Sequence, residues 1–222
     1  MNQKTALVFG ATGLTGSCLL KLLLNDSRYG KVKVFLRKKT DFPSDEKLEI
    51  HVVELSSPEK YSHLLQGHDL FCCLGTTIAV AGSKEAFRKV DFELPVKIAE
   101  AASRNKISSF SIISSLGANA KTSNFYLQTK GDMEESVQKF SFKRIAILRP
   151  SMLLGDRKEV RFVELIGKGL MRTFGFVFIG ELKKYKAIHA DDVAKAMIAI
   201  ANNNFPEKIF ESDRIRHIAK SD

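Results

Sequence analysis

A glycine-rich segment directly after the first apolar run constrains this chain more than any other feature. Residues 5–9 are apolar and strand-forming, and residues 10–16 then read Gly-Ala-Thr-Gly-Leu-Thr-Gly, while helical spacing of apolar residues begins at Leu14. Glycines between a strand and a helix allow a sharp turn, close approach of the backbone to a pyrophosphate, and tight packing of the helix on the strand. The helix N-terminus would offer free N–H groups and a partial positive charge to phosphates.

The rest of the chain alternates between strand-like and helix-like segments. Near-continuous apolar strands between helices are typical of a parallel sheet that helices cover on both faces. We expect further strands at residues 32–36, 48–53, 69–73, 110–113 and 144–148. We expect helices at residues 14–24, 84–103, 124–140 and 190–202. The pattern predicts an α/β fold with a doubly wound parallel sheet, the Rossmann fold, and a small C-terminal elaboration on the substrate side.

The pattern loosens after Pro150 without any linker-like composition. We interpret residues 1–222 as a single domain, with a dinucleotide-binding core over 1–150 and a substrate-side extension over 151–222. In the extension we expect a helix around residues 160–169 and a last strand near 208–210. Three alternating phenylalanines, Phe174, Phe176 and Phe178, either wall a substrate pocket or belong to the core or an interface.

Charge and composition narrow the partners. The 222 residues include 35 Lys and Arg against 25 Asp and Glu, a net charge of +10, so the surface attracts anions. The positive charges are scattered, with short clusters only, and we therefore favour a basic soluble surface over nucleic-acid binding. Charge-free stretches are too short for a membrane span, and the start does not resemble a signal peptide.

The three cysteines, Cys18, Cys72 and Cys73, are sparse, and two of them are adjacent. This usage is typical of a reducing compartment, so we expect a cytoplasmic protein. Cys72 and Cys73 lie in an expected strand and are interpreted as core residues. The histidines show no metal-ligand spacing with the cysteines, so we expect no metal site. We expect a helix directly after His189, with Asp191 as its cap. We interpret His189 and Asp192 as structural residues.

The end of the second strand bears on the choice of cofactor. A cofactor without a 2′-phosphate usually needs an Asp or Glu about 20 residues beyond the glycine loop. Arg37, Lys38 and Lys39 stand there instead, and the first carboxylate is Asp41. Cations suit a 2′-phosphate, and an arginine can bind it with two hydrogen bonds. The sequence therefore favours NADP(H) over NAD(H).

A tyrosine, a lysine and a serine form a candidate proton-transfer site. Tyr126 and Lys130 are four residues apart on an expected helix and so share one face. An ammonium beside a phenol favours the phenolate, which helps such a tyrosine to exchange a proton with a substrate oxygen. Ser114 and Ser115 end the expected fifth strand, where either hydroxyl could face the substrate, and Ser115 is the preferred candidate. Tyr29 and Lys33 have the same spacing but run from a turn into a strand.

These motifs resemble the short-chain dehydrogenases/reductases. The chain is most similar to an atypical branch, the Tat-interactive-protein-like NAD(P)-binding oxidoreductases, over roughly residues 5 to 215. The matching stretches are Gly-His-Asp-Leu-Phe-Cys-Cys-Leu-Gly-Thr-Thr at 67–77, Val90-Asp91, Ser-Ser-Leu-Gly-Ala at 114–118, Ser-Asn-Phe-Tyr-Leu-Gln-Thr-Lys-Gly at 123–131 and Leu-Arg-Pro at 148–150.

The resemblance implies roles for individual residues. Tyr126 would exchange the proton, Lys130 would assist it, and Ser115 would be the hydroxyl partner. Pro150 and Ser151 would border the nicotinamide. The implied cofactor-binding residues are Gly10, Ala11, Thr12, Gly13, Leu14, Thr15, Gly16, Arg37, Lys38, Glu54, Leu55, Leu74, Gly75, Thr76, Tyr126, Lys130 and Pro150.

Two functions of different classes follow. The first is an NADP(H)-dependent oxidoreductase that reduces an unidentified carbonyl substrate through Ser115, Tyr126 and Lys130. The alternative is an NADPH-binding redox sensor or regulatory protein without turnover, which would act through a protein partner. A sugar-nucleotide epimerase is less favoured, because the tail after Pro150 is short for a nucleotide-sugar lobe.

Overall fold

A computed structural model describes residues 3–155 and 185–221 of the chain. The helix expected around residues 160–169 lies outside this part, as do Phe174, Phe176 and Phe178.

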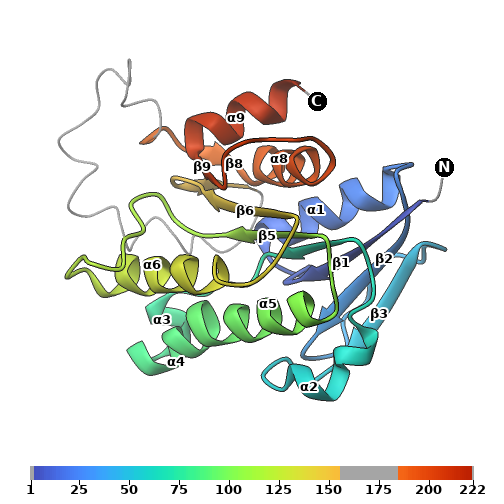
Figure 1. The fold of residues 1–222 in the computed structure, drawn as a ribbon, viewed down its shortest axis with the longest axis horizontal. Helices are drawn as coiled ribbons and strands as arrows, with labels where there is room; N and C mark the ends of the chain where they lie inside the picture. Colours follow the sequence, from blue (N-terminus) through green and yellow to red (C-terminus); the bar gives the residue numbers. More distant parts are fainter. Residues whose placement is uncertain (1–2, 156–184, 222) are drawn as a thin grey trace.

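Seven parallel strands form one sheet in the order β3-β2-β1-β4-β5-β6-β9 (Figure 1). The strands are β1 Lys4–Phe9, β2 Tyr29–Leu36, β3 Leu48–Val52, β4 Asp69–Cys72, β5 Ser109–Ile113, β6 Arg144–Arg149 and β9 Ile209–Glu211. The chain reverses its direction across the sheet between β1 and β4, and ligands of such sheets bind at the carboxyl ends of the strands there. The predicted doubly wound α/β fold is confirmed.

Helices cover both faces of the sheet (Figure 1). One face carries α1 Leu14–Asn25, α8 Ala190–Asn202 and, packed on α8, α9 Ser212–Ser221. The other carries α2 Pro58–Tyr61, α3 Ile78–Ala81, α4 Lys84–Arg88, α5 Leu94–Arg104 and α6 Phe125–Val137. A short parallel pair, β7 Leu153–Leu154 with β8 Ile188–His189, forms a second sheet.

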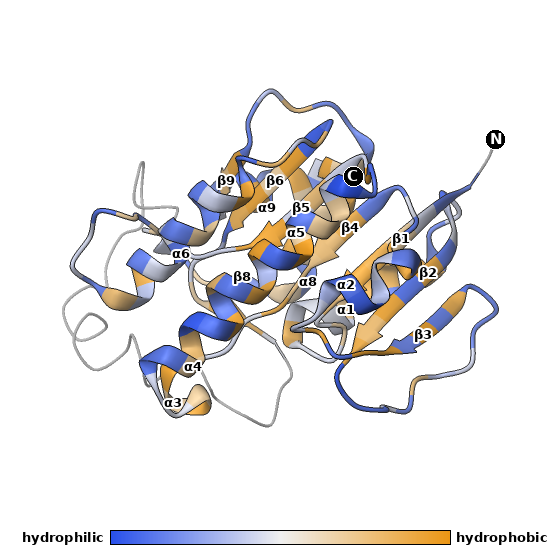
Figure 2. Cartoon of the chain, turned by 60° about the horizontal axis from the view of Figure 1, so that its bottom comes forward, coloured by the Kyte–Doolittle hydropathy of each residue, from blue (hydrophilic) through white to orange (hydrophobic). Residues whose placement is uncertain are grey.

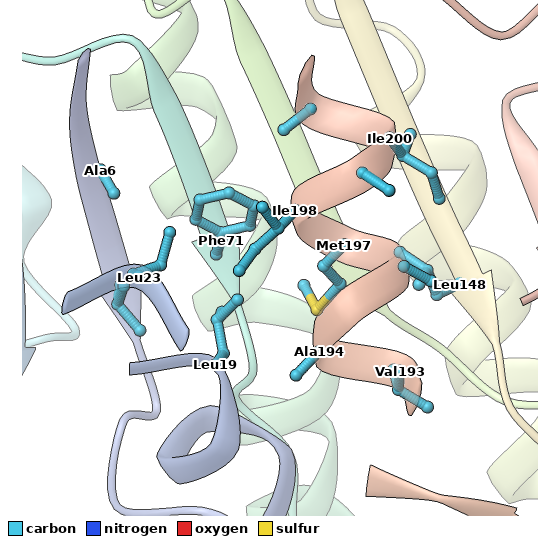
Figure 3. Packing of buried hydrophobic residues seen from close by; sticks show 14 of the residues in the cluster. Ala6, Leu19, Leu23, Phe71, Leu148, Val193, Ala194, Met197, Ile198 and Ile200 are labelled. Atoms are coloured by element: carbon cyan, nitrogen blue, oxygen red, sulfur yellow. The ribbon is translucent and has the colours of Figure 1, made fainter. Parts of the chain in front are cut away.

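Alternation along the strands divides the core in two. Ala6 and Val8 of β1 face the cluster under α1 and α8, whereas Leu7 and Phe9 face the cluster under α5 and α6. Both sets are fully buried, which explains why the strands read as continuous apolar runs. Figure 2 shows the central strands as mainly hydrophobic, whereas the helices mix hydrophobic and hydrophilic residues. In Figure 3, side chains of α1 and α8 gather around Phe71 of β4.

The structure differs from the sequence predictions in several segments. The helix expected over 84–103 consists of α4, a π-helical turn over Lys89–Glu93, and α5. The expectation that Asp191 caps α8 is wrong: His189 holds the cap position, while Asp191 lies in the first turn with its carboxylate 2.6 Å from Lys195 Nζ. Residues 188–221 supply β9 to the main sheet and α8 to its face, and α9 was not predicted.

The tyrosine–lysine pair set aside in the sequence lies far from the predicted site. Tyr29 is the first residue of β2 and does not lie in a turn. It therefore lies at the amino ends of the strands, the edge of the sheet opposite to the predicted site. Its hydroxyl donates to Asp69 at 2.8 Å, and Lys4 Nζ lies 3.1 Å from the same carboxylate. Burial raises the pKa of Tyr29 far above its ordinary value. This tyrosine therefore ties strands together and does not exchange protons.

Candidate functional site

The turn after β1 is built on glycines that leave no room for side chains. Gly10 has φ +82°, a conformation that L side chains rarely adopt, and a Cβ there would lie 2.6 Å from the carbonyl oxygen of Cys73. A Cβ on Gly16 would clash with the Gly10 carbonyl oxygen. Gly10 is thus required for the conformation of the turn and for its close contact with the end of β4. Gly16 is required for the close contact of α1 with the same turn.

The N-terminus of α1 is suited to an anion. Gly13 holds the cap position, no side chain caps the helix, and its first turn contains no acidic residue. Thr15 is 4% exposed, and its buried hydroxyl has no hydrogen-bond partner among the described residues. An uncapped helix end with an unsatisfied buried hydroxyl fits a pyrophosphate. The loop is completed by Ala11, which is buried, and by Thr12 and Leu14, which are at least partly exposed.

A groove of about 630 Å³ lies between the ends of β2 and β3 and the π-helical turn. Its lining consists of Arg37, Val52, Val53, Glu54, Leu55, Ser56, Lys89, Val90 and Leu94. Glu54 lies 2.6 Å from Lys60, which lowers the pKa of this carboxyl. No ion pair of Arg37 or Lys89 is found within the described part of the chain, so the uncompensated charge of the groove is positive. Lys38 is exposed on the same turn as Arg37 but does not line the groove.

The residues after β4 lie against a buried ion pair. Lys130 Nζ is 2.7 Å from Asp91 Oδ1, and the two side chains are 6% and 1% exposed. The other Asp91 oxygen accepts the Thr76 N–H at 2.9 Å. A Cβ on Gly75 would be in van der Waals contact with both charged groups. The segment Leu74–Thr76, predicted to run along a cofactor, therefore lies directly beside Lys130.

Tyr126 is placed by the first turn of α6. Asn124 caps this helix by accepting the Leu127 N–H, and the Tyr126 ring packs on Phe87 with centroids 5.4 Å apart. Tyr126 is half-buried and lies one turn before Lys130. Burial alone would lower the pKa of the Lys130 ammonium, but the charges of Asp91 and Tyr126 raise it above its ordinary value. Lys130 is thus a permanent cation beside the tyrosine.

The two serines after β5 have different environments. Ser114 is buried and donates to Glu134 Oε1 at 2.5 Å. Arg149 holds the same carboxylate with two donors, Nε at 2.9 Å from Oε1 and Nη2 at 2.5 Å from Oε2. The Ser114 hydroxyl therefore belongs to a structural network. The half-buried Ser115 makes a longer hydrogen bond, to the Leu116 carbonyl at 3.4 Å, and is the candidate that faces a substrate.

Backbone hydrogen bonds hold the Ser115 loop near α6 and the end of β6. Leu116 N–H donates to the Pro150 carbonyl at 3.0 Å, and Asn119 N–H donates to the Leu127 carbonyl at 3.1 Å. Pro150 is buried at the end of β6. The Ser151 hydroxyl contacts the Lys186 carbonyl at 2.5 Å and the Ser212 hydroxyl at 2.9 Å, so it is engaged within the protein.

Sequence reasoning missed three charged residues at this edge. Lys89 lines the groove, Asp91 holds Lys130, and Glu134 joins Ser114 to Arg149. The family resemblance pointed to Asp91 only as part of a motif.

Over residues 3–155 and 185–221, no group of three metal-ligating side chains could hold an ion. No helix in the same part is long and apolar enough to cross a membrane.

Comparisons with known proteins show the family and the fold. The NAD(P)H-binding family matches residues 10–204. Protein HTATIP2 of Rattus norvegicus is 33% identical over 225 residues, covering 99% of this chain and 91% of that protein. The mitochondrial protein FMP52 of Candida albicans is 33% identical over 201 residues, covering 87% and 86%. The structure of MoeE5 in complex with UDP-glucuronic acid and NAD has a TM-score of 0.69 at 18% identity, covering 92% of this chain and 74% of that one, and shows the same fold.

Glu134→Gln tests the structural network behind Ser115. The substitution keeps an acceptor for Ser114 but removes the carboxylate charge that pairs with the guanidinium of Arg149, whose side chain is 19% exposed. We expect the free energy of unfolding to fall by about 1–3 kcal/mol in urea denaturation. Asp132→Asn is the matched control, since the Asp132–Arg88 pair is more exposed; a loss no larger than in this control would contradict the assigned role.

Proposed function

The chain belongs to the NAD(P)H-binding family as an atypical short-chain dehydrogenase/reductase, and we propose that it is an NADP(H)-dependent oxidoreductase that reduces a carbonyl compound. One observation carries this proposal. The Lys130 ammonium lies against Gly75 and one helical turn from Tyr126, at the same sheet edge as the uncapped end of α1. A phosphate-binding turn and a proton-exchanging tyrosine thus meet where ligands of this fold bind.

The residues of the chain divide the work of carbonyl reduction. When bound, the dihydronicotinamide supplies a hydride to the carbonyl carbon. Tyr126 donates its phenolic proton to the carbonyl oxygen, and Ser115 donates a hydrogen bond to that oxygen. Lys130 faces the tyrosine and is held in place by Asp91. Pro150 closes the site at the end of β6, where it fixes the Ser115 loop.

The preference for the 2′-phosphate rests on the charges of the groove. Its apolar walls, which include Leu55 and Leu94, fit an adenine ring, and Arg37 and Lys89 bring two cations to it. The carboxylate of Glu54 is already paired with Lys60. A ribose hydroxyl therefore finds no free carboxylate in this groove, whereas a phosphate finds cations.

A binding protein without turnover is the second candidate. One observation favours it: the groove and the uncapped end of α1 are formed without Tyr126, so a nucleotide can bind there without proton exchange. This function shares the cofactor site, so only turnover separates it from the first.

Tyr126→Phe tests catalysis. We expect the rate of NADPH-dependent reduction, on whichever carbonyl of a panel is turned over, to fall about 10²–10⁴-fold because the proton donor is lost. NADPH binding, followed by titration calorimetry, should be retained. Tyr29→Phe is the control, since that hydroxyl lies at the opposite edge of the sheet. Tight NADPH binding with no turnover on any carbonyl by the natural protein would support the regulatory function instead.

Arg37→Ala tests the choice of cofactor. In calorimetric titrations the natural protein should bind NADPH more tightly than NADH. The substitution should weaken NADPH binding by about 10- to 100-fold, the value of a charge-assisted contact, and leave NADH binding unchanged. Lys39→Ala is the matched control, because Lys39 is an exposed cation nearby that does not line the groove. Equal binding of both cofactors by the natural protein would overturn the assignment of NADP(H).

A further inference from the structure

A carboxylate lies at the centre of the proposed site, where the sequence analysis assigned none. Asp91 is 1% exposed, and its two oxygens contact Lys130 Nζ at 2.7 Å and the Thr76 N–H at 2.9 Å. The carboxylate joins α6 to the segment after β4. It also places a full negative charge against the ammonium of Lys130, which interacts with Tyr126.

The π-helical turn over Lys89–Glu93 places this carboxylate. Such turns insert one residue into a helix and are frequent at functional sites. Removing the extra residue would rotate the preceding part of the helix by about 100° relative to α5, because an α-helix has 3.6 residues per turn. The same turn directs Lys89 toward the groove. The helix irregularity therefore serves both the cofactor groove and the ion pair.

We propose that Asp91 sets the direction of proton transfer, because it cancels the charge of Lys130 and so keeps Tyr126 in the form that donates a proton. This inference rests on the proposed function and deepens it: the site is a reductase at neutral pH. An isolated ammonium within 4–6 Å would favour the phenolate by about 1–3 pH units, and an adjacent carboxylate offsets that effect. Asp91 is thus a positioning residue that acts through Lys130.

The other groups around Lys130 do not alter this balance. Cys72 of β4 faces the pair, but burial raises the pKa of its thiol to about 12, so the thiol carries no charge. Tyr126 is the remaining titratable group that acts on Lys130 from the described elements. The net charge of the cluster with a protonated tyrosine is therefore zero.

The proton balance follows from this neutrality. In reduction, the O–H bond of Tyr126 breaks and its proton forms the new O–H bond of the alcohol, while the carbonyl carbon gains the hydride supplied by the cofactor. The resulting phenolate regains a proton from water. Oxidation of the alcohol runs these transfers in reverse and requires the phenolate first. A neutral Lys130–Asp91 pair stabilises that phenolate less than a lone ammonium would, so oxidation is confined to higher pH.

Ultraviolet absorbance titration of the phenolate tests the inference without substrate or cofactor. The chain has 4 tyrosines. Burial raises the pKa of Tyr29 and of Tyr61 well above the ordinary value, and Tyr185→Phe removes the exposed one. In this background Tyr126→Phe provides the blank, and the difference between the two titrations is the signal of Tyr126. Asp91→Asn should move the midpoint to lower pH by about 1–2 units. An unchanged midpoint would overturn the inference.

Two further variants keep the test decisive. Asp132→Asn removes a carboxylate from another ion pair of α6 and should leave the midpoint unchanged. If Asp91→Asn does not fold, the double variant Asp91→Asn/Lys130→Met replaces the test, because it removes both charges. Its midpoint should match that of the parent, and a rise of a unit or more would show that Lys130 acts uncompensated. Failure of the natural protein to bind NADPH would contradict the proposed function, whereas the titration would still report on the ion pair.

Discussion

The contact between the turn at Gly10 and the carbonyl of Cys73 is the constraint on which the rest of this structure depends. It joins the ends of β1 and β4, the two strands between which the sheet reverses. No side chain fits there, so the backbone itself forms the wall of the crevice. The same turn starts α1 with its N–H groups uncapped. A helix end suited to a phosphate therefore arises from the fold before any specialised side chain contributes.

Buried charges then arrange the chemistry around that crevice. Two ion pairs, Asp91–Lys130 and Glu134–Arg149, lie beneath the residues that would contact a substrate. Burying such groups is costly unless each is paired and hydrogen-bonded, so each pair admits few alternative arrangements. Glu134 accepts a hydrogen bond from the Ser114 hydroxyl, which distinguishes Ser114 from Ser115. In the inference drawn above, Asp91 determines how strongly the positive charge of Lys130 acts on Tyr126. The fold supplies a helix end suited to a phosphate, and in the proposed function these pairs adjust the proton chemistry beside it.

Local patterns explain how much the sequence predicted. The strands, α1, α6 and α8 were predicted because apolar periodicity and the glycine turn act over neighbouring residues. Tyr126 and Lys130 were placed on one helical face for the same reason. The π-helical turn was not predicted, since its sequence reads as one amphipathic helix. The pairing of Asp91 with Lys130 and of Ser114 with Glu134 joins distant residues, which periodicity cannot detect. The prediction that Asp191 caps α8 was wrong because its carboxylate pairs along the helix with Lys195.

The central claim is that a dinucleotide binds across the carboxyl ends of β1 and β4. Hydrogen–deuterium exchange of the backbone amides, with and without NADPH, tests it most directly. The account predicts slower exchange in the glycine loop over residues 10–16 and in the segment 74–76, with no change around Lys4 and Tyr29 at the opposite edge. Binding of NADPH without protection of the glycine loop, or with protection centred on the opposite edge, would contradict it.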